Sequence, residues 1–235
     1  HFAMDRLTGF MSDFYRQHGT EGYILKCDIR KYFNSVHHDV LKDMIRRMKL
    51  SDDVKWLLCL IIESYECSGN RGIPMGNQTS QWFALYYLDG LDRLVKEKLR
   101  IRYYSRYMDD MILLHPCKEY LEYCLAVMNT YVRNTLRLEF NEKTQIHPVS
   151  QGVDYLGFHF YLTDTGKVIR RLRQCGKKRI RKRLRALKRL YNNNEIDLDP
   201  IKRSVVSTKG HLSHGHTWHL QKNIWKNFVL SRKST

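Results

Sequence analysis

The chain has 235 residues, enough to bury one large core or two modest ones. Apolar residues make up 43% of it, as in ordinary globular proteins, and no run of eighteen uncharged apolar residues predicts a membrane span. Lysine and arginine number 41 against 24 aspartate and glutamate, which gives a net charge of +17. This excess indicates a polyanionic partner, usually nucleic acid, because an anionic membrane surface would require a basic helix with a clean apolar face.

The six cysteines are scattered, without a C-x-x-C pair. A disulfide framework or a zinc site would require closer, paired spacing, so we expect reduced thiols and a cytoplasmic protein. The four histidines within residues 209–225 have no cysteine or acid among them, and we expect them to pack and to contact nucleic acid. The chain begins without methionine or a signal-peptide pattern, so we expect it to be part of a longer protein.

The periodicity of apolar residues predicts strands alternating with helices. In chain order the predicted elements are a strand at 22–29, helices at 39–48 and 52–66, a glycine-punctuated loop at 70–77, a helix at 80–99, a hairpin of strands 101–106 and 111–115, a helix at 118–135, short strands at 145–149, 153–158 and 159–162, and a helix at 177–191. This order predicts an α+β fold in which an antiparallel sheet is backed by helices.

Positive charge is concentrated in residues 165–191, which hold thirteen lysines and arginines and no acid. A solvated helix face would normally mix charges of both signs. The acid-free run therefore favours a surface that contacts phosphates.

Two adjacent carboxylates, Asp109 and Asp110, lie at the tip of the predicted hairpin, where glycine or asparagine is usual. Asp28 ends the apolar strand at 22–29. If the hairpin lies beside that strand, the three carboxylates converge, repel one another and raise their own pKa values. Divalent metal is the natural compensation, because oxygen ligands suit Mg²⁺ and two such ions support in-line phosphoryl displacement. The pair Asp52–Asp53, which follows Ser51, instead predicts a helix N-terminus.

Six motifs resemble those of reverse transcriptases, in the order of that family and over essentially the whole chain. They are "KCDIRKYFNSVHHDVL" (26–41), "RGIPMGNQTSQWFALYYLDGLDR" (71–93), "YMDD" (107–110), "NEKTQIHP" (141–148), "DYLGFHF" (154–160) and the basic segment after residue 165. The resemblance implies a right-hand polymerase: partial fingers and the start of the palm in 1–27, a palm with interleaved fingers helices in 28–165, and a basic helical thumb in 166–235.

The resemblance also implies roles for individual residues. The catalytic carboxylates would be Asp28, Asp109 and Asp110, which with the carbonyl of Ile29 would bind two Mg²⁺ ions, or Mn²⁺ as a substitute. The implied nucleotide-binding residues are Ile29, Arg30, Lys31, Tyr32, Phe33, Met75 and Gly76. The implied primer contacts are Tyr107, Met108, Leu156 and Gly157. The implied contacts to the nucleic-acid backbone are Arg170, Arg171, Lys177, Lys178, Arg181 and Arg185.

Some of these roles have alternatives. Lys143 is a candidate general acid for the pyrophosphate leaving group, or else a solvated surface charge. Tyr107 and Met108 would contact the primer end, or else pack the hairpin. Phe33, five residues after Asp28, matches the aromatic steric gate that excludes a ribose 2′-OH, although it could merely pack under the sheet. A gate predicts that the enzyme selects dNTPs, and the resemblance implies an RNA template and a DNA or RNA primer as the other partners.

Two departures from the family pattern bear on subclass and activity. The glycine turn reads Pro74-Met75-Gly76 before "NQTSQ", which is similar to the error-prone bacterial enzymes of diversity-generating retroelements, with a dedicated template RNA and an accessory protein. Group II intron-like, retron-like and phage-defence reverse transcriptases stay open as alternative subclasses. Only 27 residues precede Asp28, so we expect an upstream segment with Lys or Arg that closes the site. The alternatives to DNA synthesis are an RNA-dependent RNA polymerase and a catalytically incomplete RNA-binding protein.

Overall fold

The computed structural model describes residues 2–65, 67, 69–74 and 76–231. The chain divides into two compact units, residues 21–149 and residues 1–20 together with 150–235. The expected polymerase regions, divided at 27/28 and 165/166, stay a prediction. Residues 158–162 pair with residues 168–172, which keeps both sides of position 165 in one sheet.

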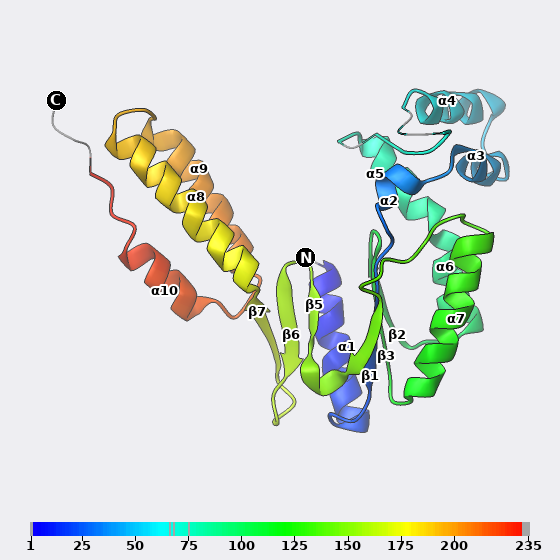
Figure 1. Cartoon of the computed structure of the whole chain (residues 1–235), viewed down its shortest axis with the longest axis horizontal. Coiled ribbons are helices and arrows are strands. Elements are labelled where there is room, and N and C mark those ends of the chain that lie inside the picture. The colour runs from blue at the N-terminus through cyan, green and yellow to red at the C-terminus, as the bar shows by residue number, and fades with distance from the viewer. Residues whose placement is uncertain (1, 66, 68, 75, 232–235) are drawn as a thin grey trace. The chain divides into compact units, whose positions relative to one another are not determined.

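The unit of residues 21–149 is an antiparallel four-stranded sheet with helices (Figure 1). Its elements are β1 (Tyr23–Cys27), α2 (Tyr32–Ser35), α3 (His38–Arg46), α4 (Asp52–Glu63), α5 (Gln78–Tyr87), α6 (Asp89–Arg93), a π-helical segment (Leu94–Lys98), β2 (Tyr103–Tyr107), β3 (Asp110–His115), α7 (Lys118–Asn134) and β4 (Gln145–Pro148). The strand order is β2-β3-β1-β4. The predicted α+β class and the predicted hairpin are confirmed.

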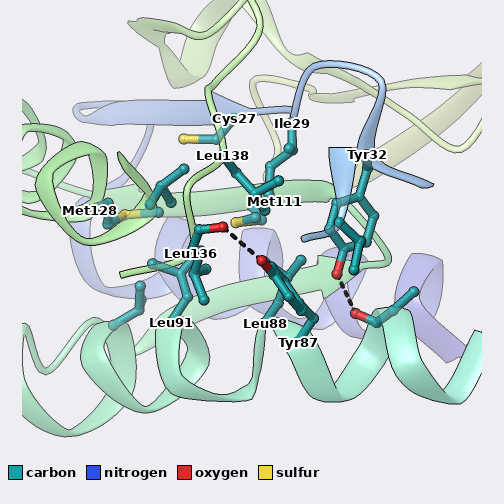
Figure 2. Packing of buried hydrophobic residues seen from close by; sticks show 14 of the residues in the cluster. Cys27, Ile29, Tyr32, Tyr87, Leu88, Leu91, Met111, Met128, Leu136 and Leu138 are labelled. Atoms are coloured by element: carbon teal, nitrogen blue, oxygen red, sulfur yellow. Dashed lines mark hydrogen bonds between the residues drawn. The ribbon is translucent and has the colours of Figure 1, made fainter. Parts of the chain in front are cut away.

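Apolar runs explain the two central strands. Residues 111–114 of β3 and Ile24, Leu25 and Cys27 of β1 are buried, as expected for strands covered on both faces. Helix α7 contacts β1, β3 and β4 along the sheet. Figure 2 shows Leu88 and Leu91 packing with Met111, Met128 and Leu136 in this core.

Buried tyrosines join the loops to the core helices. The Tyr87 hydroxyl donates to the Leu136 carbonyl at 2.7 Å, and the Tyr32 hydroxyl donates to the Ala84 carbonyl at 2.5 Å (Figure 2). Both hydroxyls are therefore satisfied inside an apolar environment, where an unpaired one would cost about 1–3 kcal/mol. The Tyr32 bond fixes the segment after β1 against α5, and the Tyr87 bond fixes α5 against the segment after α7.

Several predicted elements have different bounds, four of them in ways that change the local structure. The helix expected at 80–99 is divided at Leu88 and continues as α6 and the π-helical segment. The helix expected at 52–66 ends at Glu63, and it begins at Asp52 after Ser51, which confirms the predicted helix N-terminus. The strands expected at 153–158 and 159–162 are separated by a turn at Leu156–Gly157, because both residues have positive φ angles, of 48° and 87°.

The other unit holds an antiparallel three-stranded sheet in the order β5-β6-β7. Its elements are α1 (Phe2–His18), β5 (Val153–Tyr155), β6 (Phe158–Leu162), β7 (Val168–Leu172), α8 (Gln174–Asn192), α9 (Leu198–Leu212) and α10 (Trp218–Lys226). Helix α1 contacts β7, and α8 packs on α9. The sequence interpretation missed α1, although Met4, Leu7, Met11 and Phe14 are buried at helical spacing. It also missed β7, which lies in the segment expected to be helical.

Within the described ranges, none of the helices is long and apolar enough to span a bilayer. All six cysteines lie in the described part of the chain and are free.

Candidate active site

Strand register brings the three predicted catalytic carboxylates to one end of the sheet. Strand β1 pairs antiparallel with β3, and the last pair is Cys27 with Met111. Asp28 directly follows Cys27 and Asp110 directly precedes Met111, so the two acids lie at the same end of neighbouring strands. This end of the sheet, with Asp28, Asp109 and Asp110, is called the carboxylate edge. Strand β2 pairs with β3 up to Tyr107 and Asp110, which leaves Met108 and Asp109 as the turn. The convergence that the sequence predicted is therefore present in the backbone.

The three carboxylates perturb one another. Burial raises the pKa of Asp109, and the charge of Asp28 and a hydrogen bond between the two carboxyls raise it further, against the opposing effects of a backbone hydrogen bond and Arg106. Burial also raises the pKa of Asp110 to about 6, with a further contribution from Asp28 and opposition from Lys26. The neighbouring Cys27 thiol has a raised pKa, chiefly because it is buried and then because of Asp110. Negative charge at this edge is thus under-compensated by protein groups.

Lys26 is a cation beside the carboxylates at this end of the sheet. Its Nζ lies 3.5 Å from Oδ1 of Asp110. Apart from this ion pair, Asp110 Oδ1 is buried without a hydrogen-bond partner in the part of the chain that the structure describes. A buried carboxylate oxygen with so little compensation suits a hard cation such as Mg²⁺. Among the residues the structure describes, no group of three or more His, Cys, Asp or Glu side chains is arranged to hold a metal ion, so the metal site stays a prediction.

Asn141 holds Asp28 in place. Its backbone N–H donates to the Asp28 carbonyl at 2.6 Å, and its Nδ2 donates to Oδ2 of Asp28 at 3.2 Å. The Asn141 side-chain oxygen in turn accepts the backbone N–H of Lys143 at 3.1 Å, the Asx turn that asparagine favours. Lys143 itself is exposed. Sequence reasoning missed Asn141 and Lys26, although Asn141 opens the quoted "NEKT" motif and Lys26 lies two residues before Asp28.

The backbone pairing around Ile29 turns its carbonyl away from Phe140. Ile29 bridges Phe140, and the flanking bonds run from Arg30 N–H to Glu139 and from Asn141 N–H to Asp28. This pattern makes Ile29 and Phe140 a non-hydrogen-bonded pair, whose own carbonyls point away from each other. The role of the Ile29 carbonyl as a metal ligand stays a prediction.

Comparison with known proteins decides the family. The model described as "Reverse transcriptase (RNA-dependent DNA polymerase)" matches residues 2–160. The chain belongs to this family.

Solved structures agree with this family on the fold of the chain. Telomerase from Candida albicans, in complex with a TWJ fragment of telomeric RNA, matches with a TM-score of 0.52 at 15% identity, over 81% of this chain and 39% of that one. Apo telomerase from Candida tropicalis matches with a TM-score of 0.54 at 13% identity, over 86% and 43%. The chain thus spans about two fifths of the telomerase chains it matches. No curated protein matches it.

The reverse transcriptase motifs at 28–36 and 71–77 lie side by side. The Ile73 N–H donates to the Phe33 carbonyl at 2.9 Å, and the Gly72 N–H donates to the Val36 carbonyl at 2.8 Å. Gly72 has a φ angle of 105°, and a Cβ there would lie 3.0 Å from Cys67 Cβ, so glycine is required. The glycine loop is therefore pinned beside the predicted gate Phe33, which is half-buried against the core.

The other predicted nucleotide-binding residues differ in how free they are. Arg30 is exposed, with its guanidinium 3.8 Å from Glu139. Lys31 is exposed and precedes α2 with a φ angle of 47°. The Tyr32 ring is buried in the core, so only its backbone is left to face a nucleotide. Gly76 has a φ angle of 91° and open space around its Cα, while Met75 lies outside the described residues.

The predicted primer contacts lie in two turns. Tyr107 is exposed at the end of β2, whereas Met108 packs partly against the core with a φ angle of 54°. Leu156 and Gly157 form the β5–β6 turn of the other unit.

Five of the six predicted backbone-contacting cations are available on the surface, and one is committed elsewhere. Arg171, Lys178, Arg181 and Arg185 are exposed, and the pKa of Lys177 is lowered by burial and by the charges of Arg171 and Arg181. Arg170 is the remaining cation, and its guanidinium binds protein groups.

Arg170 corrects the sequence interpretation. Its guanidinium bonds Thr8 Oγ1 at 2.8 Å, Asp5 Oδ1 at 2.6 Å and the His214 carbonyl at 3.4 Å. Its backbone N–H donates to Nδ1 of His216 at 3.1 Å. With its side chain only 16% exposed, Arg170 ties α1 to β7 and to the loop before α10. It supports the unit instead of facing solvent, because each of its three guanidinium nitrogens donates to a protein acceptor.

Proposed function

We propose that the protein synthesises DNA on an RNA template by transferring nucleotides from dNTPs to a primer 3′-OH. The observation that supports this most strongly is the strand register that brings Asp28, Asp109 and Asp110 to one edge. Three half-buried carboxylates with one nearby lysine are costly in a binding-only protein. They become useful where divalent metal and phosphates complete the charge balance.

The residues present fit such a role. Asp28, Asp109, Asp110 and the carbonyl of Ile29 would hold divalent metal, which supplies charge stabilisation of a transferring phosphoryl group. Asn141 keeps the Asp28 carboxylate at the strand end, and Lys26 balances part of the charge of Asp110. Phe33, fixed beside Ile73, would leave no room for a ribose 2′-OH. Lys143 would be a candidate proton donor to the pyrophosphate, because its backbone is anchored through Asn141.

The basic surface of α8 would bind the backbone of the template–primer duplex. Lys178 and Arg181 of α8 are exposed, as is Arg171 of the neighbouring strand β7, and burial together with the charges of Arg171 and Arg181 lowers the pKa of Lys177. Such a surface gains binding free energy from the release of counterions, and this gain weakens with salt.

Primer extension on an RNA template tests the proposal. The wild-type protein with Mg²⁺ should extend a DNA primer with dNTPs and reject rNTPs. Asp109→Ala should lose at least about a hundredfold in rate, the scale of a lost electrostatic group in an active site, while RNA affinity stays unchanged. Asp52→Ala is the matched control, because Asp52 is a fully exposed acid at the start of α4.

Each failure of this experiment has a distinct meaning. Equal use of rNTPs and dNTPs would indicate an RNA-dependent RNA polymerase. RNA binding without extension by the wild-type protein would indicate a catalytically incomplete binding protein. A fall in RNA affinity of Asp109→Ala equal to its fall in rate would show that the acids are structural.

We also propose that copying is error-prone, on the sequence pattern around Met75 alone. Sequencing of cDNA from a defined RNA should find errors concentrated at template adenines. Uniform fidelity would instead favour the intron-like relatives.

A further inference from the structure

The turn that carries Asp109 has an unusual backbone. Met108 has a φ angle of 54°, in the left-handed region that costs a residue other than glycine about 1–3 kcal/mol and persists only where its surroundings hold it. The turn is only two residues long, between the paired Tyr107 and Asp110. Something must therefore hold the peptide that joins Met108 to Asp109.

Arg106 is the group that holds this peptide. Its Nη1 donates to the Met108 carbonyl at 3.0 Å. Because a peptide group is planar, fixing the orientation of that carbonyl also fixes the N–H of Asp109 and the direction in which the Asp109 Cα leaves the turn. Arg106 lies two residues before Met108, but its side chain is only 9% exposed and its position is set from elsewhere in the fold.

Asp92 of α6 sets the position of Arg106. The Arg106 Nε donates to Asp92 Oδ1 at 2.8 Å, and Nη2 pairs with Asp92 Oδ2, which completes a two-point contact. The Tyr104 hydroxyl donates to Asp92 Oδ1 at 2.6 Å, and Arg106 Nη2 also reaches the Leu85 carbonyl at 3.3 Å. A planar guanidinium bound at this many points has one orientation, which lysine could not reproduce.

The support behind Asp92 is rigid. Its neighbour Leu91 is fully buried in the core shown in Figure 2, and so is Val95, one turn further along the chain. The helix continues from α6 into a π-helical segment at Leu94–Lys98, a rare form that is frequent at functional sites. A chain of contacts thus runs from the core through Asp92 and Arg106 to the Met108–Asp109 peptide.

We propose that Arg106 and Asp92 are positioning residues of the polymerase site, which set the Asp109 carboxylate by holding the Met108 carbonyl. Stability alone is a weak reason for this pair, because apolar residues of similar volume can replace a buried ion pair at little cost. The inference rests on the proposed function for its kinetic consequence, but not for its structural one.

The test compares Arg106→Lys with Arg93→Lys in the purified protein. Arg93 pairs with Asp89 in the same helix, but both side chains are exposed, so the control makes the same change in a nearby ion pair. With an RNA template, Arg106→Lys should lower kcat at least about tenfold and change the dNTP KM less than about threefold, as expected for misplacement of a reacting group. Amide hydrogen exchange in a peptide covering 107–111 should accelerate about tenfold. Arg93→Lys should change neither.

Two further variants keep the test decisive if Arg106→Lys does not fold. Asp92→Asn keeps the shape of the carboxylate and removes its charge. Tyr104→Phe removes one hydrogen bond and leaves the ion pair, so its kcat should fall only about threefold. Both variants should accelerate amide hydrogen exchange at 107–111, and the variant that loses more kcat should show the larger acceleration.

The outcomes separate this inference from the proposed function. An inactive wild-type protein would contradict the proposed function, while the exchange measurement would still test the positioning role. If the wild type is active, an unchanged kcat or an unchanged rate of exchange in Arg106→Lys would overturn the positioning role. Where Arg106→Lys does not fold, the same result in Asp92→Asn would overturn it.

Discussion

The two units of the molecule handle charge in opposite ways. In residues 21–149 the three carboxylates are half-buried, and two of them have a fixed partner: Asn141 for Asp28 and Lys26 for Asp110. Along α8 in the other unit, cations such as Lys178 and Arg181 stand exposed. The contrast indicates that catalysis requires charged groups at fixed positions, even where burying them costs free energy. Attraction of a polyanion requires only a high density of exposed positive charges. Changes in the first unit should therefore alter rate, and changes in the second should alter affinity.

The largest effect is expected from Asp28→Asn, which keeps the side chain's size and removes its charge. The extension rate should fall at least about a hundredfold, with RNA affinity unchanged. Primer extension and fluorescence anisotropy on the same preparation measure the two quantities. Asp53→Asn, at the exposed start of α4, is the control, and comparable rates for the two variants would contradict a catalytic role of Asp28.

The triple variant Lys177→Ala, Lys178→Ala and Arg181→Ala should have the opposite profile. RNA affinity should fall, and the slope of its logarithm against the logarithm of salt should decrease by about 2, since each lost phosphate contact removes about 0.7–0.9. At saturating RNA the rate should be nearly that of the wild type. An unchanged salt slope would show that these cations do not contact the nucleic-acid backbone.

Arg170→Ala separates a structural cation from its exposed neighbours. Loss of its bonds to Asp5, Thr8 and the His214 carbonyl should lower the free energy of unfolding by about 2 kcal/mol. Arg171→Ala, at an exposed position of the same strand, should stay within about 0.5 kcal/mol. Urea denaturation measures both, and equal stability of the two variants would refute the support role of Arg170.

The smallest effect is expected from Asp110→Asn in the metal-free protein. An amide at this half-buried position has no charge to desolvate and no repulsion from Asp28, so stability at pH 7 should rise by about 1 kcal/mol. Mg²⁺ should raise the melting temperature of the wild type but not of this variant. A melting temperature that responds equally to Mg²⁺ in both proteins would place metal binding elsewhere.

Part of the site could be predicted from residue patterns and part could not. Strand-like runs around Asp28 and around Asp109–Asp110, followed by antiparallel pairing, suffice to bring the three acids together. Asn141 contacts Asp28, 113 residues away, and Asp92 contacts Arg106 across the π-helical segment between α6 and β2, 14 residues away; the local pattern of residues encodes neither contact. Strand β7 was missed because apolar and polar residues do not alternate in "VIRRL". Pairing with β6 outweighs the weak local preference of these residues for a strand. Arg170 was misassigned because a charge count does not reveal which side chain turns inward.

The central claim is that the carboxylate edge carries the chemistry and the basic helix carries the binding. The most direct test measures RNA affinity and single-nucleotide addition at saturating RNA, side by side, for Asp109→Ala and for the triple variant of Lys177, Lys178 and Arg181. We expect Asp109→Ala to lose rate and keep affinity, and the triple variant to lose affinity and keep rate. Loss of both quantities in each variant, or retention of rate in Asp109→Ala, would contradict it.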